Sequence, residues 1–452
     1  MSVKEARGPI LRWAVLAALW AWIATAGAPD AYAAASTTVV PMPNVGVSPG
    51  TVAGSKPLTL EEAVRIGLDN HSRIKSAGFQ TFAQDAIVKQ RMSAYYPVVT
   101  FDNGFTNRGG KATQTSDSLS SRIGFDMTLY NFGKREGTVQ AARETLDARQ
   151  FFYQATSNDI ALLVKQSYYR VLQRNALLNV NDDTVKNRAA TLKQTQSFYE
   201  VGTRPRSDVT QAQANLFTAQ ARLIQARKDV DVAWAELRNA MGVDELAKQP
   251  LAEDLSLAPF PLKLEQAKEE AFAHRPELLQ FSADLRARDQ LIAVARRNHL
   301  PDFTFNSSYG WNGSNSGADL FPLQPNWSVG LNFNIPLFNG FQTTYKLQEE
   351  LANHGSTKEQ LRAQRQQVAL EVETNYLNLV ALRDVVNANE AAVLAGKQNL
   401  ELQEARYQVG YATIVDVTTA QVTLTTAQID HVNSIIDYKL AVAQVINAIG
   451  RQ

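Results

Sequence analysis

An internal duplication constrains the fold of this chain more than any other feature of its sequence. Two halves match at a nearly constant spacing, and the matched positions are residues 58–63 with 262–267, Pro97 with Pro301, Phe101 with Phe305, Val164 with Val372, residues 199–202 with 407–410, Asp208 with Asp416, and Gly242 with Gly450. A duplicated sequence indicates a duplicated structural unit. We therefore expect a first repeat over residues 58–242, a connector over 243–261 and a second repeat over 262–450, each with the order helix, strand, strand, long helix, turn, long helix.

The N-terminus has the three parts of a secretory signal peptide. Basic residues precede the apolar run 13–24, and Ala31 and Ala33 are small residues suited to cleavage. The apolar run is shorter than the about 20 residues that a transmembrane helix requires. We expect residues 1–33 to be a signal peptide and residues 34–57, rich in Pro, Gly, Val and Ser, to form an extended leader.

Charge and residue usage argue against several classes of function. Lys and Arg number 45 against 44 Asp and Glu, so the chain lacks the basic excess of a nucleic-acid-binding protein. It contains no cysteine, which rules out disulfides and thiolate metal sites. The five histidines are scattered, and nucleotide-binding and nucleophile-elbow motifs are absent. We expect no enzyme activity, no cofactor, no metal and no nucleic-acid partner.

Four segments, two in each half, alternate apolar and polar residues with the two-residue period of a strand. They are long enough to cross a membrane as tilted strands, and aromatic residues gather at their ends as in interfacial girdles. A soluble sandwich is the alternative, but the export signal and the polar segments 108–120 and 312–320, expected to be extracellular loops, favour a membrane barrel. The positions expected to face outer-membrane lipid are Phe101, Phe105, Phe125, Leu129, Phe303, Phe305, Val329, Leu331 and Phe333.

Four strands are too few to close a membrane barrel, because known barrels begin at about eight strands. An eight-stranded barrel is filled by its own side chains. A dimer would therefore be plugged, and a trimer with twelve strands is the smallest assembly that leaves an open tube. The sequence thus predicts a mixed α/β membrane protein, with a trimeric 12-stranded β-barrel to which each chain gives four strands.

Long helices are expected in four segments rich in Ala, Gln, Leu, Glu and Arg, which are good helix formers. The longest would measure about 100 Å at 1.5 Å per residue, unless a break occurs near Asn181 or Gly355. Apolar residues step by three or four along residues 209–237, as on a packed helical face. From the helices alone, a coiled-coil bundle without a pore is equally consistent. These segments are residues 134–199, 208–241, 342–408 and 416–449.

A glycine-bearing turn separates the paired long helices in each half. Each turn has the pattern Tyr-x-Val-Gly with Asp-Val six residues later. Glycine suits the left-handed position after a helix, and Ser or Asp caps the helix that follows. We expect both turns to be the tips of helical hairpins.

This turn pattern, followed by Ala-Gln in both halves, strongly resembles the TolC family of outer-membrane efflux proteins, over essentially the whole mature chain. The resemblance implies a homotrimer in the cell outer membrane whose barrel continues as a long α-helical periplasmic barrel. It implies a passive exit duct of a tripartite efflux pump or a type I secretion system. The implied partners are a periplasmic adaptor protein and, through it, an inner-membrane pump. The alternative function is a periplasmic coiled-coil scaffold without a pore.

The resemblance also implies that the hairpin tips form the periplasmic gate and the adaptor-docking site. Two positions depart from the family pattern: Ala412 replaces an arginine, and Thr419 replaces the second aspartate of a ring. The links that close the gate must therefore differ, and the arginines of the first tip are candidates for them. The residues assigned to the gate and docking tips are Tyr199, Gly202, Arg204, Arg206, Asp208, Tyr407, Gly410 and Asp416.

Overall fold

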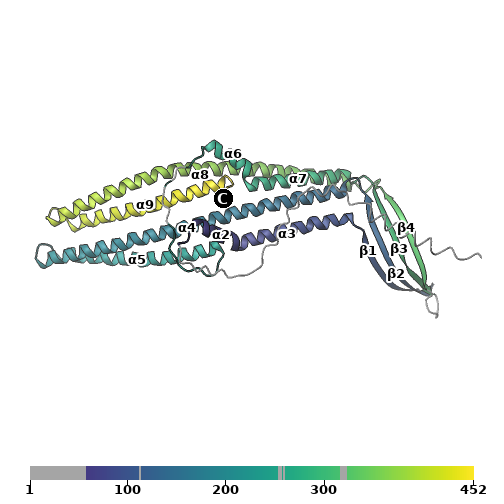
Figure 1. Cartoon of the computed structure of the whole chain (residues 1–452), viewed down its shortest axis with the longest axis horizontal. Helices are drawn as coiled ribbons and strands as arrows, with labels where there is room; N and C mark the ends of the chain where they lie inside the picture. The colour runs from purple at the N-terminus through teal and green to yellow at the C-terminus, as the bar shows by residue number, and fades with distance from the viewer. Residues whose placement is uncertain (1–56, 111–112, 253–256, 258–259, 316–322, 452) are drawn as a thin grey trace, which may run out of the picture. The chain divides into compact units, whose positions relative to one another are not determined.

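The computed structural model describes residues 57–110, 113–252, 257, 260–315 and 323–451 (Figure 1). The expected signal peptide and residues 34–56 of the expected leader lie outside the described residues. Among the helices of the described part, none combines the length and the apolar character that crossing a membrane requires. The same part of the chain holds no group of three side chains suited to bind a metal ion.

Two long antiparallel helical hairpins account for most of the described chain (Figure 1). The first pairs α4 (Lys134–Glu200) with α5 (Arg206–Met241), and the second pairs α8 (Gln342–Gln408) with α9 (Ile414–Ala448). Buried apolar residues spaced by three or four run along α5 from Ala219 to Leu237, with Ala212 buried nearer the turn.

The longest helices, α4 and α8, run for 67 residues each without interruption. The breaks considered near Asn181 and Gly355 do not occur. The Asn181 side chain donates to the carbonyl oxygen of Leu177, one turn earlier, at 2.7 Å, and so lies along the helix. Gly355 is exposed and lowers helix propensity by only about 1 kcal/mol, which the helix-forming residues on either side can offset.

Two short helices precede the strands in each half, where the sequence indicated one. They are separated by a single extended residue, His71 or Arg275. Gly242 and Gly450, at the ends of the long helices, take positive φ and lie directly against these kinks, so a side chain there would collide with the backbone. The helices are α2 (Leu60–Asn70) and α3 (Ser72–Met92), followed in the second half by α6 (Leu264–His274) and α7 (Pro276–Arg297).

The strands form one antiparallel sheet in the order β1-β2-β3-β4. Pairing between β2 and β3 joins the two halves of the chain. The expectation of a loop over residues 108–120 is wrong, because most of this polar segment continues the β1–β2 ladder, with Asn107 opposite Asp117. Residues 316–322 lie outside the described residues. The strands are β1 (Val98–Gly110), β2 (Thr113–Tyr130), β3 (Asp302–Asn315) and β4 (Gln324–Asn334).

The sheet has one apolar and one polar face. Pairs such as Phe101 with Ile123 and Phe305 with Leu331 place the large apolar side chains on the same side across all four strands. Of the positions expected to face lipid, all but Leu129 share this face, since Leu129 sits at a register shift. Many of these side chains are exposed in the single chain, and Leu331 is 75% exposed. The opposite face carries Ser, Thr, Asn, Gly and charged residues.

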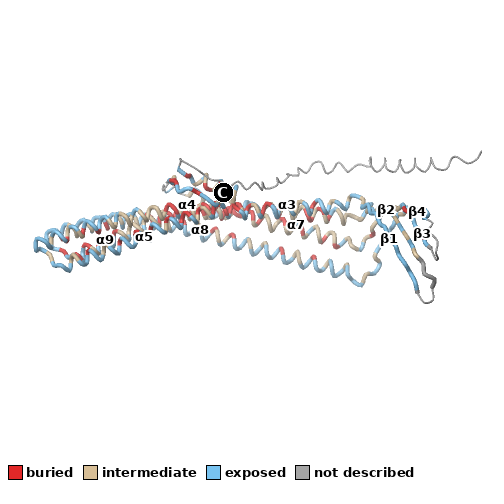
Figure 2. The backbone as a smooth tube through the Cα atoms, turned by 90° about the horizontal axis from the view of Figure 1, so that it is seen from below, coloured by how far each residue is buried: buried red, intermediate tan, exposed pale blue. Residues whose placement is uncertain are grey.

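Buried residues concentrate along the helices, whereas the strands are largely exposed (Figure 2). The largest cluster lies where α2 and α5 pack on α4. There the hydroxyl of Tyr168 lies 2.8 Å from the carbonyl oxygen of Leu58 and 2.9 Å from that of Ala252. This contact holds the start of the first repeat and the segment after α5 against the same helix.

Candidate functional site at the hairpin tips

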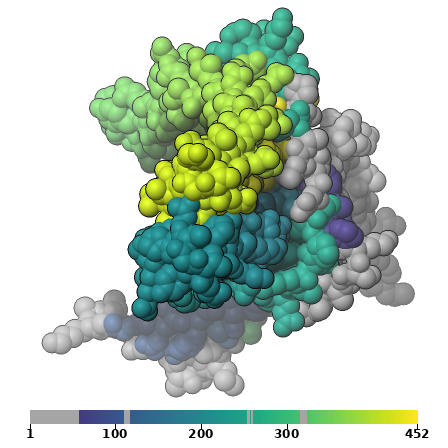
Figure 3. Space-filling view, turned by 90° about the vertical axis from the view of Figure 1, so that its left-hand side faces the viewer, coloured from purple at the N-terminus to yellow at the C-terminus, as the bar shows by residue number. Residues whose placement is uncertain are grey.

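The two hairpin tips lie at the end of the long helices opposite the sheet (Figure 1), and side by side when seen from that end (Figure 3). We call residues 199–208 the first tip and residues 407–416 the second tip. Side-chain hydrogen bonds link the two. Segments about two hundred residues apart in sequence therefore form one site.

Both turns are built in the same way around a left-handed glycine. Gly202 has φ of 76° and Gly410 has φ of 87°, and open space surrounds each, so backbone conformation alone favours glycine here. The next residue donates its N–H back to the last helical turn, from Thr203 to the Phe198 carbonyl at 2.9 Å and from Tyr411 to the Arg406 carbonyl at 2.8 Å. These are helix-ending hydrogen bonds that satisfy terminal carbonyl groups.

Tyr407 forms the centre of the site and is 1% exposed. Its ring packs with Ile414 and Val417 and lies 6.0 Å from the ring of Phe198 in the first hairpin. Its hydroxyl donates to Oδ2 of Asp208 at 3.3 Å. Burial, together with the negative charge of Asp208, raises the pKa of Tyr407 to about 12, so the phenol stays protonated and remains a donor.

Arg204 reaches from the first tip onto the second. Its Nη2 donates to the carbonyl oxygens of Tyr407, at 2.8 Å, and of Ala412, at 3.4 Å. Its guanidinium carbon lies 4.4 Å from the centre of the Tyr407 ring, within range of a cation–π attraction. Because Tyr407 belongs to the last turn of α8, the cation also lies at the negative end of that helix.

Asp416 does not take part in this link. It is exposed, and its Oδ2 accepts from the N–H of Thr413 at 2.8 Å and from the hydroxyl of Thr413 at 2.7 Å. The Thr413 hydroxyl accepts in turn from the Asp416 N–H, which completes a capping box at the start of α9. These hydrogen bonds, the backbone one first, hold the pKa of Asp416 below its usual value.

Of the residues assigned to the tips from the sequence, the structure brings Arg204, Asp208 and Tyr407 into one contact network. Tyr199 and Arg206 are exposed on the first tip and lie outside it. Sequence reasoning missed Thr413 and Phe198. The Thr-x-x-Asp spacing from Thr413 to Asp416 is a capping-box signal that could have identified the former.

Comparison with known proteins decides the family. A model of the family described as outer membrane efflux protein matches residues 65–243 and 268–451. The chain belongs to this family. As an outer membrane efflux protein it is a channel protein of the outer membrane, of the kind used for efflux and secretion, and the predicted class of function and location are confirmed.

Individual relatives agree with this assignment. The outer membrane protein TolC of Vibrio cholerae serotype O1 is 29% identical over 401 residues, covering 86% of this chain and 90% of the relative. TolC of Escherichia coli strain K12 is 29% identical over 369 residues, covering 78% of this chain and 72% of the relative. The transmembrane channel CusC superposes with a TM-score of 0.78 at 17% identity, covering 87% of this chain and 92% of that chain. The predicted TolC-like fold, with four strands per chain, is confirmed.

Proposed function

We propose that three copies of this outer membrane efflux protein form the passive exit duct of a tripartite efflux pump or a type I secretion system. The observation that carries the proposal is the open four-stranded sheet, apolar on one face and polar on the other, at the end of two long helical hairpins. The apolar face would meet lipid and the polar face would line the duct. The chain would supply a conduit rather than catalysis, with energy provided by its partners.

The two outer edges of the sheet support assembly into a ring of copies. Strands β1 and β4 are its outer members, so each has one edge free to pair with a neighbouring copy. Pairing β4 of one copy with β1 of the next three times gives a closed ring of twelve strands. The exposed apolar residues Phe217 and Ile224 on α5, and Leu370 and Leu377 on α8, would be covered by neighbouring helices in the same ring.

The tips would form the gate and the docking site for a periplasmic adaptor protein, through which an inner-membrane pump connects. Arg204, Asp208 and Tyr407 tie the two hairpins of one chain together, and this would hold the entrance narrow. Val201, Val409 and Tyr411 leave apolar surface exposed at the turns. An adaptor that covered this surface could compete with the Arg204 link.

The decisive experiment is single-channel conductance of the purified, detergent-solubilised protein in planar bilayers, with its mass measured alongside. Discrete conductance steps from a trimer are the expected result. A monomer without conductance would favour the periplasmic coiled-coil scaffold.

The lipid-facing role of the strands is tested by Leu331→Asp, because an unpaired charge on that face would have to enter hydrocarbon. We expect this variant to be lost from outer-membrane fractions. Asn326→Asp, on the polar face of the same strand, is the matched control and should assemble normally. Phe305→Asp should behave like Leu331→Asp. Equal assembly of all three variants would contradict the assignment of the faces.

The role of Asp416 is tested in the same bilayers. Carboxylates from three chains would converge near the axis of the entrance, and we expect Asp416→Ala to raise conductance or to weaken cation selectivity. Asp182→Ala, at a partly exposed position of α4 well away from the tips, is the control. Conductance and selectivity equal to the wild type would remove Asp416 from the gate.

A further inference from the structure

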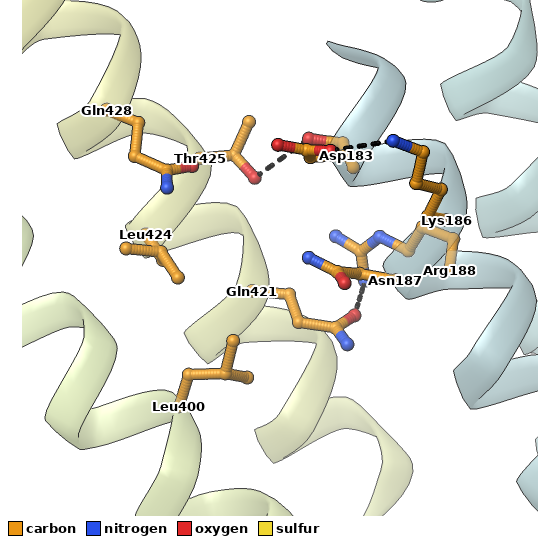
Figure 4. Close-up of a pocket in the computed structure, with 10 residues that line it drawn as sticks. Asp183, Lys186, Asn187, Arg188, Leu400, Gln421, Leu424, Thr425 and Gln428 are labelled. Carbon is orange, nitrogen blue, oxygen red and sulfur yellow. Dashed lines mark hydrogen bonds and ion pairs between the residues drawn. The ribbon is translucent and has the colours of Figure 1, made fainter. Parts of the chain in front are cut away.

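A cavity of about 230 Å³ lies between the two hairpins, several helical turns from the tips in the direction of the sheet (Figure 4). Its walls come mainly from α4 and α9, with Leu400 contributed by α8. The lining is predominantly polar, and one group stands out. Arg188 of α4 points into the cavity toward Gln421 of α9 (Figure 4).

Arg188 is a buried cation whose hydrogen-bond partner is neutral. The residue is 7% exposed, and its Nη1 donates to Oε1 of Gln421. The Gln421 amide is itself held by donation from Nε2 to the Thr191 hydroxyl at 2.9 Å. The described residues place no carboxylate in ion-pair contact with this guanidinium. Burying an uncompensated charge is costly.

The electrostatics of the surroundings add to this cost. Burial lowers the pKa of Arg188, and the nearby positive charge of Arg222 acts in the same direction. An arginine nevertheless stays protonated at neutral pH. A positive charge is therefore held next to a cavity, with a second cation nearby.

The remaining charged groups of the lining compensate each other. Nζ of Lys186 lies 3.0 Å from Oδ1 of Asp183 and 2.8 Å from Oδ2 of Asp182, and all three side chains are substantially exposed. In Figure 4 the contact between Lys186 and Asp183 is separate from the contact between Arg188 and Gln421. These three groups together carry a formal charge of −1, but neither carboxylate is in ion-pair contact with Arg188, whose described hydrogen-bond partner is the neutral Gln421.

The second repeat does not reproduce this arrangement. At the spacing that aligns Tyr199 with Tyr407, the position of Arg188 corresponds to Gly396. An added Cβ at Gly396 would lie 3.4 Å from the Cα of Leu424, so α8 and α9 pack closely there. The cavity and its cation therefore belong to the contact between the two repeats, where Arg188 meets α9.

We propose that this cavity is an anion site, which takes a small oxyanion of the phosphate or carboxylate type against Arg188. The guanidinium presents several N–H donors in one plane, which suits two oxygens of such a group. Amide and hydroxyl groups of Asn187, Thr425 and Gln428 supply neutral hydrogen-bonding partners around it. The cavity volume exceeds that of one water molecule several times over. A bound anion would neutralise Arg188 and join α4 to α9.

The test is equilibrium binding of inorganic phosphate, and separately of acetate, to the full-length protein purified in detergent. We expect saturable binding of one ion per chain. Arg188→Gln should weaken it at least about tenfold, since a charge-assisted contact is lost. Lys193→Gln removes an exposed positive charge from the same helix outside the cavity lining and should bind as the wild type does. Preference for phosphate would identify a phosphate-type ligand, preference for acetate would identify a carboxylate, and equal binding of both would show a site that accepts either oxyanion.

A second variant keeps the test decisive if Arg188→Gln fails to assemble. Gln421→Glu places a carboxylate from the chain itself beside Arg188, and should abolish binding of either probe while the protein keeps its oligomeric state. Absence of saturable binding of both ions to the wild type would overturn the proposal. So would unchanged affinity in Gln421→Glu or in a folded Arg188→Gln.

Discussion

The two hairpin tips share a turn design but use equivalent residues differently. Both end a 67-residue helix with a left-handed glycine and a tyrosine one turn earlier. In the second tip that tyrosine, Tyr407, is buried, whereas Tyr199 of the first tip is exposed. The equivalent aspartates also differ, because Asp208 accepts from Tyr407 and Asp416 caps α9.

This difference shows how a duplicated chain can build a site that a symmetrical pair could not. Arg204 of the first tip covers the carbonyl groups of the second tip, where Ala412, at its own equivalent position, is small and buried. The first tip thus supplies the charged side chains of Arg204 and Asp208, and the second tip supplies the carbonyl groups and the phenol that they contact. Each of the following experiments changes one residue of the link and uses an equivalent or neighbouring tip residue outside the link as its reference.

The largest effect is expected at the tyrosines. Removing the buried ring in Tyr407→Ala should destabilise the second tip by about 3 to 5 kcal/mol, as for other large aromatic truncations. Tyr199→Ala should change the first tip by less than about 0.5 kcal/mol because the side chain is exposed. Hydrogen exchange of the amides in both tips measures the difference. Equal losses of protection would show that the tips are equivalent.

The next effect concerns the arginines of the first tip. Arg204→Gln removes charge-assisted hydrogen bonds to two carbonyl groups of the second tip and should cost about 1.5 to 3 kcal/mol. The loss should be seen as faster exchange in the second tip, although the change is made in the first. Arg206→Gln, at an exposed neighbouring position, is the control. If both variants exchange alike, Arg204 does not link the hairpins.

The smallest effect is expected in the pKa of the Tyr407 phenol. The pKa of Tyr407 is raised to about 12, so the buried phenol holds its proton above the value of about 10 expected for an unfolded chain. The stability that depends on this protonated group is complete below about pH 10 and is lost as pH rises through 12. Asp208→Asn should lower this pKa only partly, because burial is the larger cause. Alkaline absorbance titration, with Tyr407→Phe subtracted, measures the shift, and Asp416→Asn should leave it unchanged.

The features that could be predicted from the sequence are those set by local pattern. Helix-forming composition predicted both hairpins, and alternation predicted the four strands and, Leu129 aside, the shared face of their apolar residues. The polar residues at 108–120 led to a wrong prediction of where β1 ends and β2 begins. Backbone pairing in a ladder does not require apolar side chains. No strong sequence signal marks the kink at His71. The equivalent kink at Arg275 is partly signalled by Pro276, because proline favours the first position of a helix.

The contacts of the site were less accessible to sequence reasoning. Arg204 was a candidate link, but its acceptor lies 203 residues away, and no spacing rule identifies a partner at that distance. Which tyrosine is buried depends on the packing of one hairpin against the other, and the two turn motifs look alike. The functions assigned to individual tip residues remain predictions.

The outer strands of the sheet also bear on how the protein is made. As long as the outer edges of β1 and β4 are unpaired, their N–H and C=O groups can form hydrogen bonds with another extended chain. Such groups cannot enter hydrocarbon while they lack hydrogen bonds. In the proposed trimer, subunit association would therefore have to accompany insertion rather than follow it.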